Sequence, residues 1–295
     1  MSVRTALRVV GRMLLLISAI FTPFALVTLS ADEDLGVEER ETIERTFPAA
    51  KSIDIDNVDG SITLTGTDAR EVKVEIHKTI RARSAEKVQE AKREVRLDMA
   101  QQGDELRLYV DGPFRCNCTD GSFNYRGSRF YGYEVSFDFT VKAPRDTNVR
   151  LRTVNHGNIR LENTAGAFDV ENINGVVDLV EVAGSGHAYA LNRPLKVMFS
   201  RNPAGASDFG SLNGDVEVAF RPDLSADVWL KTFNGQAYTD FDVTAMPSRP
   251  AVREQHDGKF VYKSHQFYGV RVGHGGPELK FDAFNGDIRI RNRER

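Results

Sequence analysis

The sequence predicts an all-β fold, built as a β-solenoid in which short strands stack as successive turns of one coil. A corner motif recurs, in which an apolar residue and Asn or Asp precede Gly, and apolar residues follow two and four positions after the Gly. In the middle of the chain the motif returns in steps of 18 or 21 residues. The alternation after each glycine gives every copy one apolar face, as in a half-buried strand.

Each step has room for two short strands and two turns. The corners at positions 156, 174, 192, 213 and 234 are 18, 18, 21 and 21 residues apart, and position 192 is a copy without glycine. Asn and Gly tolerate a positive φ, which we expect at these corners. Asn-Gly is also a strong hairpin signal, so an antiparallel meander or sandwich is the alternative, but the near-constant step favours the solenoid. The predicted turn residues are Asp59, Gly60, His156, Gly157, Asn174, Gly175, Asn213, Gly214, Asn234, Gly235, Asn285 and Gly286.

The first 31 residues are typical of a signal peptide. Three arginines precede an uncharged run at residues 13–29, and the small residues Thr28 and Ser30 suit signal-peptidase cleavage near residue 30 or 31. We therefore expect export to the periplasm or cell envelope. A retained N-terminal membrane anchor is the alternative, because about 17 to 25 apolar residues can span a bilayer.

A single domain is expected over residues 40–295, interrupted first by a helical insertion at residues 84–97. Ser84 can cap this helix, and apolar residues recur along one face with charged residues opposite.

The second insertion, residues 112–132, is rich in glycine, arginine and aromatic residues. Aromatic residues and arginine are enriched in interface hot spots, and planar rings stack on sugars. The insertion can instead fold over an open end of the β core, as a solenoid cap does. Cys116 and Cys118 suggest a disulfide in an oxidising compartment, although one intervening residue strains such a bond and pairing with other chains stays open. The candidate contact residues are Phe114, Arg115, Phe123, Tyr125, Arg126, Arg129, Phe130, Tyr131 and Tyr133.

Composition indicates a globular chain, with 41% hydrophobic and 27% charged residues. Loss of residues 1–30 removes three of the 39 basic side chains and none of the 42 acidic ones, which leaves a formal charge near −6. Nucleic acid is therefore not an expected partner, because phosphate binding needs a basic face. Membrane contact is expected only if the N-terminal segment is retained.

Several segments together resemble a bacterial family described as a "putative adhesin" domain of unknown function. They are NINGVVDL, SLNGDVEVAF, TFNGQAYTDF and GHGGPELKFDAFNGDIRIRNR, preceded by FDFTVKAP at residues 137–144. The resemblance covers roughly residues 47–292 and rests on repeated turns. It implies a β-solenoid-like fold and an exported or membrane-linked location, and it carries over no catalytic residue.

No residue pattern is typical of an active site, a metal centre or a cofactor. The histidines lack zinc-site spacing, and no P-loop, dinucleotide fingerprint or serine elbow is present. The acidic run at residues 54–59 lacks carboxylates at the two ends of a calcium loop. We expect neither enzymatic activity nor a cofactor. Asp215 and Asp287 follow glycine in equivalent corners, and are the pair that a glycan-cleaving enzyme could use.

The sequence therefore favours a non-enzymatic scaffold or interaction protein of the cell envelope, which binds a glycan or a protein partner. Two alternatives stay open. One is a polysaccharide-active lyase or hydrolase, because β-helical folds host both. The other is a component of an envelope-stress sensor. Fold analogy alone cannot choose among them.

Overall fold

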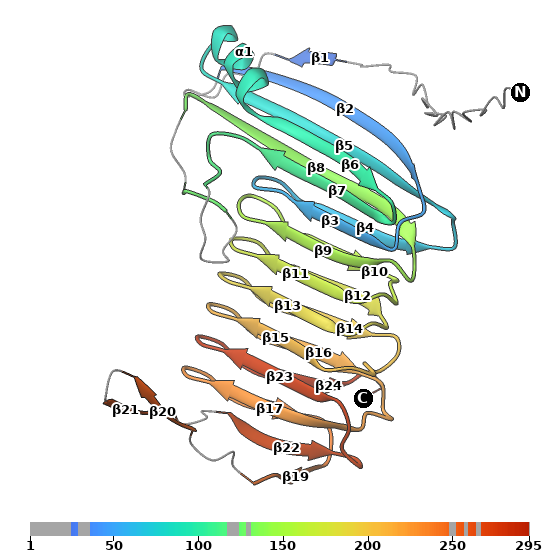
Figure 1. Ribbon diagram of the computed structural model, residues 1–295, viewed down its shortest axis with the longest axis vertical. Coiled ribbons are helices and arrows are strands. Elements are labelled where there is room, and N and C mark those ends of the chain that lie inside the picture. Colours follow the sequence, from blue (N-terminus) through green and yellow to red (C-terminus); the bar gives the residue numbers. More distant parts are fainter. Residues whose placement is uncertain are drawn as a thin grey trace, which may run out of the picture.

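Figure 1 shows the computed structural model as two long sheets that face each other along one stack. In the described part of the chain, each sheet (named here sheet A and sheet B) contains eleven strands, and a separate hairpin contains two more. The all-β prediction is confirmed. No helix in the described part of the chain is long and apolar enough to cross a bilayer. The structure describes residues 25–28, 36–116, 124–127, 131–247, 252–256, 259–263 and 267–294.

Sheet A changes from antiparallel to parallel pairing along the stack. Its first four strands pair antiparallel, and every pair from β8 onward is parallel. In order of pairing, the strands are β1 (Ala25–Thr28), β2 (Val37–Pro48), β5 (Glu71–Ala82), β8 (Tyr133–Pro144), β4 (Ile62–Thr67), β10 (Ile159–Glu162), β12 (Val177–Val182), β14 (Leu195–Phe199), β16 (Val216–Phe220), β24 (Ile288–Asn292) and β18 (Ala237–Thr239).

Sheet B is parallel in its centre and antiparallel at both ends. In order of pairing, its strands are β6 (Arg96–Gln102), β7 (Glu105–Asp111), β3 (Ser52–Asp56), β9 (Asn148–Thr153), β11 (Phe168–Asn172), β13 (Gly186–Ala190), β15 (Ser207–Ser211), β23 (Glu278–Ala283), β17 (Ala226–Thr232), β22 (Tyr268–Val272) and β19 (Val243–Ala245). The separate hairpin is β20 (Val252–His256) with β21 (Lys259–Lys263).

Equivalent residues of successive repeats lie directly opposite one another. In sheet A, Ile159 pairs with Val177, Val177 with Leu195, and Leu195 with Val216. All four side chains are fully buried between the sheets, so each repeat adds one layer to a continuous apolar core. Because this pairing is parallel, the repeats do not form the antiparallel meander that was the alternative prediction.

The order of the repeats in space differs from their order in the sequence. The last repeat, β23 and β24, lies between β15–β16 and β17–β18, and Figure 1 shows its red strands next to orange ones on both sides. The constant 21-residue step suggested that the corners at 213 and 234 are neighbours. That expectation is wrong, because the corner at Asn285 lies between them and has an equivalent sequence.

The corner glycines are required by close packing between neighbouring repeats. A Cβ atom on Gly175 would lie 1.8 Å from the carbonyl oxygen of Gly157, and one on Gly286 would lie 2.1 Å from that of Gly214. The expected positive φ is found at only two of the predicted turn residues, Gly60 (105°) and His156 (48°). The expectation was wrong elsewhere because the glycines make room for the backbone of the next repeat.

The corner asparagines form a ladder of side-chain hydrogen bonds along the stack. Each Nδ2 donates to the Oδ1 of the neighbouring corner at 2.7–2.9 Å, and Asn155 donates to the hydroxyl of Tyr125 at 3.1 Å. At the first close-spaced corner the ladder residue is Asn155, whereas His156 turns toward Asp59. The ladder runs through Asn234, Asn285, Asn213, Asn192, Asn174 and Asn155.

Helix α1 (Ala85–Glu94) packs on the long antiparallel strands β2, β5 and β8 at the N-terminal end of the stack. The side chain of Ser84 caps it by accepting a hydrogen bond from the backbone N–H of Lys87. Val88 and Ala91 are its buried residues. The helix is shorter than the expected segment 84–97, because the chain becomes extended at Val95 and enters β6.

Candidate functional site

A cavity of about 670 Å³ lies where β2, β5 and β8 meet the first corners of the repeats. Its lining is polar throughout, with charged groups of both signs and several hydroxyls. We call it the polar cavity. It is lined by Arg40, Glu41, Thr42, Asp59, Gly60, His77, Lys78, Thr79, Arg81, Glu134, Ser136, Asp138 and His156.

A second cavity, of about 390 Å³, lies on the other side of the same corner. Four aromatic rings contribute to its lining, and we call it the aromatic cavity. It shares Asp59, Glu134 and His156 with the polar cavity, so the two hollows meet at these three residues. The remaining lining is Val58, Phe114, Tyr125, Gly127, Tyr131, Tyr133, Val135 and Asn155.

Asp59 and His156 form an ion pair at this junction, with Asp59 Oδ2 2.9 Å from His156 Nδ1. Burial raises the pKa of Asp59, and the hydrogen bond from His156 offsets part of that rise. The hydrogen bond to Asp59 raises the pKa of His156. Both pKa shifts favour keeping a proton on the pair. Asp59 and His156 are therefore hydrogen-bonded to each other, and together they form the polar wall between the two cavities.

Lys78 borders the polar cavity, but its side chain lies on the other face of β5. It alternates with the buried Ile76 and Ile80, and its ammonium is 5.6 Å from the ring centroid of the core residue Phe137. Burial lowers its pKa.

On the cavity face, Arg40 and Arg81 are both held by the buried carboxylate of Glu38, at 2.6 and 2.8 Å. Ser136 of β8 also lies on this face, and its hydroxyl is a group of the cavity that a ligand can use.

The second insertion is fastened to the stack by Arg115. Its guanidinium pairs with Asp56 at 2.9 Å, donates to the backbone oxygens of Val110 and Asp56, and lies over the ring of Tyr109. Only 6% of the Arg115 side chain is exposed. Arg115 was predicted as a contact residue, and the structure gives its side chain a buried, structural position.

The other predicted contact residues fall into three groups. Phe114, Tyr125, Tyr131 and Tyr133 line the aromatic cavity, and the rings of Tyr131 and Tyr133 stack with centroids 5.8 Å apart. Arg126 is exposed to solvent. Phe123, Arg129 and Phe130 lie outside the described residues.

Tyr133 links the aromatic cavity to helix α1. Its hydroxyl donates to Glu94, and burial together with this carboxylate raises the pKa of Tyr133. Cys116 is disulfide-bonded, and the other cysteine, Cys118, lies outside the described residues.

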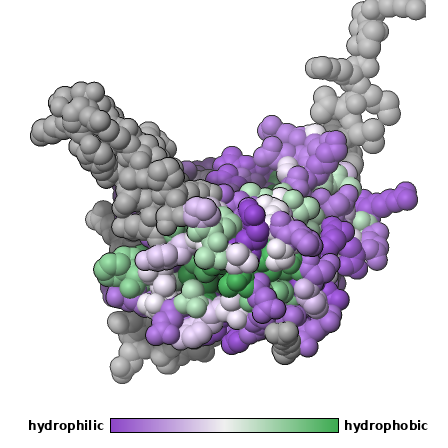
Figure 2. All heavy atoms as spheres, turned by 90° about the horizontal axis from the view of Figure 1, so that it is seen from below, coloured by the Kyte–Doolittle hydropathy of each residue, from purple (hydrophilic) through white to green (hydrophobic). Residues whose placement is uncertain are grey.

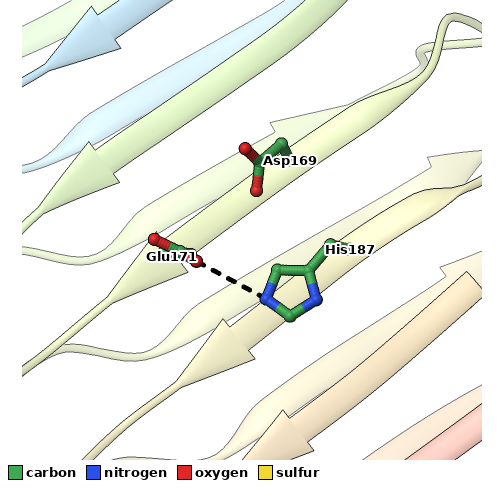
Figure 3. A group of neighbouring side chains, drawn as sticks. All are labelled: Asp169, Glu171 and His187. Carbon is green, nitrogen blue, oxygen red and sulfur yellow. Dashed lines mark ion pairs between the residues drawn. The ribbon is translucent and has the colours of Figure 1, made fainter. Parts of the chain in front are cut away.

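A group that could hold a metal ion lies further along the stack, on the outer face of sheet B (Figure 3). Asp169 and Glu171 of β11 and His187 of β13 each offer a ligand atom within 4.8 Å of the others. Both carboxylates already have arginine partners, because Arg152 lies 3.1 Å from Glu171 and Arg150 lies 3.7 Å from Asp169. The arrangement is that of cross-strand ion pairing, and a cation would compete with these arginines.

The carboxylates considered for an enzyme do lie together, on neighbouring repeats. Arg289 pairs with Asp215 at 2.5 Å and with Asp287 at 2.7 Å. The backbone N–H of Asp287 donates to Asp215, and this bond and Arg289 lower the pKa of Asp215. A carboxylate held ionised in this way is unsuited to act as a general acid.

The site combines residues that no local motif connects. The sequence singled out Asp59 as a turn residue and as part of an acidic run, and His156 as a turn residue, whereas Glu134 and Ser136 carried no signal. Their proximity arises because β5 and β8 fold back beside the first repeat corner. The aromatic content of the insertion was the one feature that indicated this end of the molecule.

No protein-family model matches the chain, and no curated protein matches it in sequence. Similar solved structures include a "putative cell adhesion protein" from Clostridium sporogenes, with 10% identity, a TM-score of 0.36, and coverage of 85% of this chain and 100% of the other. A "putative adhesin" from Bacteroides fragilis has 12% identity, a TM-score of 0.35, and coverage of 85% and 96%. A "putative lipid binding protein" from Parabacteroides distasonis has 11% identity, a TM-score of 0.30, and the same coverage.

Proposed function

We propose that this protein is a non-enzymatic, exported β-solenoid scaffold of the cell envelope, which binds a glycan where the polar and aromatic cavities meet. The observation that carries the proposal is the junction itself. Rings of the insertion line one hollow, and charged and hydroxyl groups line the other. Sugars need both surfaces, because their C–H faces pack on aromatic rings and their hydroxyls exchange hydrogen bonds with polar side chains.

The polar groups support binding more than catalysis. Asp59 is paired with His156, and Asp138 accepts a hydrogen bond from the backbone N–H of Ser61 at 2.8 Å. Ser136, on the face of β8 that lines the polar cavity, has no side-chain hydrogen-bond partner among the described residues. A ligand that lies across the junction would reach this hydroxyl on one side and the ring of Tyr131 on the other.

The test is calorimetric titration of the protein with defined oligosaccharides, namely muropeptides, chitooligosaccharides and maltooligosaccharides. One class should bind, and Ser136→Ala and Tyr131→Ala should each weaken its binding about tenfold, the effect of losing roughly 1.4 kcal/mol. Ser200→Ala is the matched control, because Ser200 is an exposed serine several repeats away. Unchanged melting temperatures would show that the variants remain folded.

Two results would contradict the proposal. The first is equal binding by the wild type and both cavity variants, or no binding across the whole set. The second is release of new reducing or unsaturated ends from these oligosaccharides, which would show a hydrolase or a lyase instead.

A further inference from the structure

At the C-terminal end of the stack, sheet B extends two strands further than sheet A. Sheet A ends at β18, which forms one repeat with β17 of sheet B. Sheet B continues past β17 to β22 and then β19, as Figure 1 shows. Among the described strands, none in sheet A lies opposite these last two. The end of the molecule is therefore a step two strands high.

The inner face of this step is apolar. Val272 belongs to the core and Val270 packs against it, so this side of β22 faces inward. Val243 and Ala245 of β19 lie opposite these two residues in register, and hence on the same face. Tyr268 is on this face as well, and is 76% exposed.

Exposed large hydrophobic side chains gather at this end. Figure 2 views the molecule from this end and shows a hydrophobic area surrounded by hydrophilic residues. Of the six such side chains in the described residues, five belong to the last repeats or to the step, and Met198 is the exception. A patch of this kind on a folded protein marks an interaction site. The five are Phe233, Tyr238, Val243, Tyr268 and Phe284.

The two edge strands of the step are open on one side. β18 and β19 each pair with one neighbour only among the described strands. They are three residues long each, and short length limits edge pairing, but Lys, Pro or inward-pointing charges are the devices that block it. Neither strand carries any of these, since their sequences are AYT and VTA.

We propose that a second copy of this chain covers the step, in a two-fold symmetric dimer joined end to end. The two-fold axis of this dimer runs parallel to the strands and lies between the two sheets. Rotation about it places sheet A of one copy in the plane of sheet B of the other, and it leaves the direction of every strand unchanged. The protruding β22 and β19 of the second copy then fill the two positions beyond β18. The other plane is completed in the same way, so both sheets continue through the dimer.

Strand direction agrees with this arrangement. Strands of sheet A run opposite to the facing strands of sheet B (Figure 1), and β19, antiparallel to β22, runs the same way as β17. After rotation, β19 of the second copy lies antiparallel to β18, which is the pairing that edge strands make most readily. The exposed inner faces of both steps become one core.

The second copy is favoured over the protein's own hairpin. β20 and β21 pair only with each other, and Figure 1 places them to one side of the stack. Head-to-tail growth is disfavoured because the N-terminal end is covered by α1 and by the antiparallel strands of sheet A. A closed dimer is thus the assembly that the shape of the step permits.

Sedimentation velocity of the purified protein tests the proposal, supported by hydrogen exchange at residues 237–239 and 243–245. We expect a species of twice the monomer mass that dissociates on dilution. The amides of residues 237, 239, 243 and 245, which face the open edges, should be protected only in the dimer. Val243→Lys places a charge on the inner face of the step and should yield a monomer with an unchanged melting profile. Thr244→Lys, on the outer face of the same strand, should remain a dimer.

A monomer at every micromolar concentration tested would overturn the proposal, as would a dimer that survives Val243→Lys. Protection of both edge strands in a monomer would show instead that the chain's own hairpin covers the step. None of these results bears on glycan binding, which concerns the opposite end of the stack.

Discussion

At the N-terminal end of the stack, three antiparallel strands of twelve residues and a helix continue the molecule past the repeats, whereas at the C-terminal end the sheets stop at strands of three residues. The first end buries its aromatic residues, with Phe137 and Phe139 each 1% exposed. The second leaves Phe233 71% and Tyr268 76% exposed. The last strands of a stack have unpaired backbone groups and an exposed apolar face. Long strands and a helix cover these at the N-terminal end, whereas no described element covers them at the C-terminal end.

The covered end is also where the cavities form. Repeats stack closely because the glycine at each corner lets the backbone of the neighbouring repeat approach it. Where the regular corner of Asp59 and His156 meets the irregular strands β5 and β8, this close approach is lost and the polar and aromatic cavities remain. The two proposals thus concern opposite ends of the stack, ligand binding at the N-terminal end and self-association at the C-terminal end.

The largest expected effect is on the free energy of unfolding. A Gly→Ala substitution at a corner in the middle of the stack should lower it more than the same substitution at the last repeat. Gly175→Ala drives a Cβ into the carbonyl of Gly157, 1.8 Å away, with another repeat packed on the opposite side. We expect a loss of about 3 kcal/mol in unfolding free energy. Gly235→Ala meets Gly286 at 2.0 Å, but β18 can move outward, so about 1 kcal/mol is expected.

Urea unfolding followed by circular dichroism measures both losses. A cost at Gly235 equal to that at Gly175 would show that the last repeat is as confined as the middle ones. The last repeat would then not be more mobile than the rest of the stack.

A smaller effect is expected at the covered end from Arg115→Met. The change leaves the mostly buried carboxylate of Asp56 without its guanidinium and removes the hydrogen bonds that hold the insertion to the stack. We expect a loss of about 2 kcal/mol in unfolding free energy, the cost of an unpaired buried charge that water partly solvates. Hydrogen exchange should also rise in the insertion. Arg126→Met, an exposed arginine of the same insertion, is the control and should change neither quantity.

Much of the repeat region could be predicted from the sequence, because a corner motif depends only on nearby residues. The alternation after each glycine predicted the buried faces of β10, β12, β16 and β24. The place of the last repeat could not be predicted, since LNG at 212–214 and FNG at 233–235 and 284–286 are interchangeable as neighbours. The role of the corner glycines could not be predicted either. They allow the backbones of two repeats to approach closely, and this is a tertiary contact that no local pattern shows.

The candidate site was largely beyond sequence reasoning for a related cause. Glu134 and Ser136 lie in a strand whose alternation explains them as ordinary surface residues, and only the return of β8 beside β4 brings them to the corner. The aromatic residues of the insertion were found because their composition differs from that of the repeats. Departures from a repeat can be recognised locally, whereas cavities between distant segments cannot.

The smallest expected effect is a pH dependence of the melting temperature, which arises from the Asp59–His156 pair at the first corner. Asp59 raises the pKa of His156 above its ordinary value of 6.5. The folded state then binds a proton more tightly than the unfolded state, so the pair's contribution is fully present below about pH 6.5 and is lost as pH rises through the raised pKa. Because the His156 side chain is largely exposed, the shift in melting temperature should be small.

Calorimetric melting of the wild type and His156→Gln between pH 6 and 8.5 isolates this contribution. His187, whose pKa is raised by its hydrogen bond to Glu171, titrates in both proteins and cancels in the difference. The wild type should exceed the variant most at pH 6, and the two should converge at the alkaline end. A difference that is constant with pH would mean that the Asp59–His156 pair does not form in solution. The wall between the two cavities would then be open, and the ligand site would be one continuous groove.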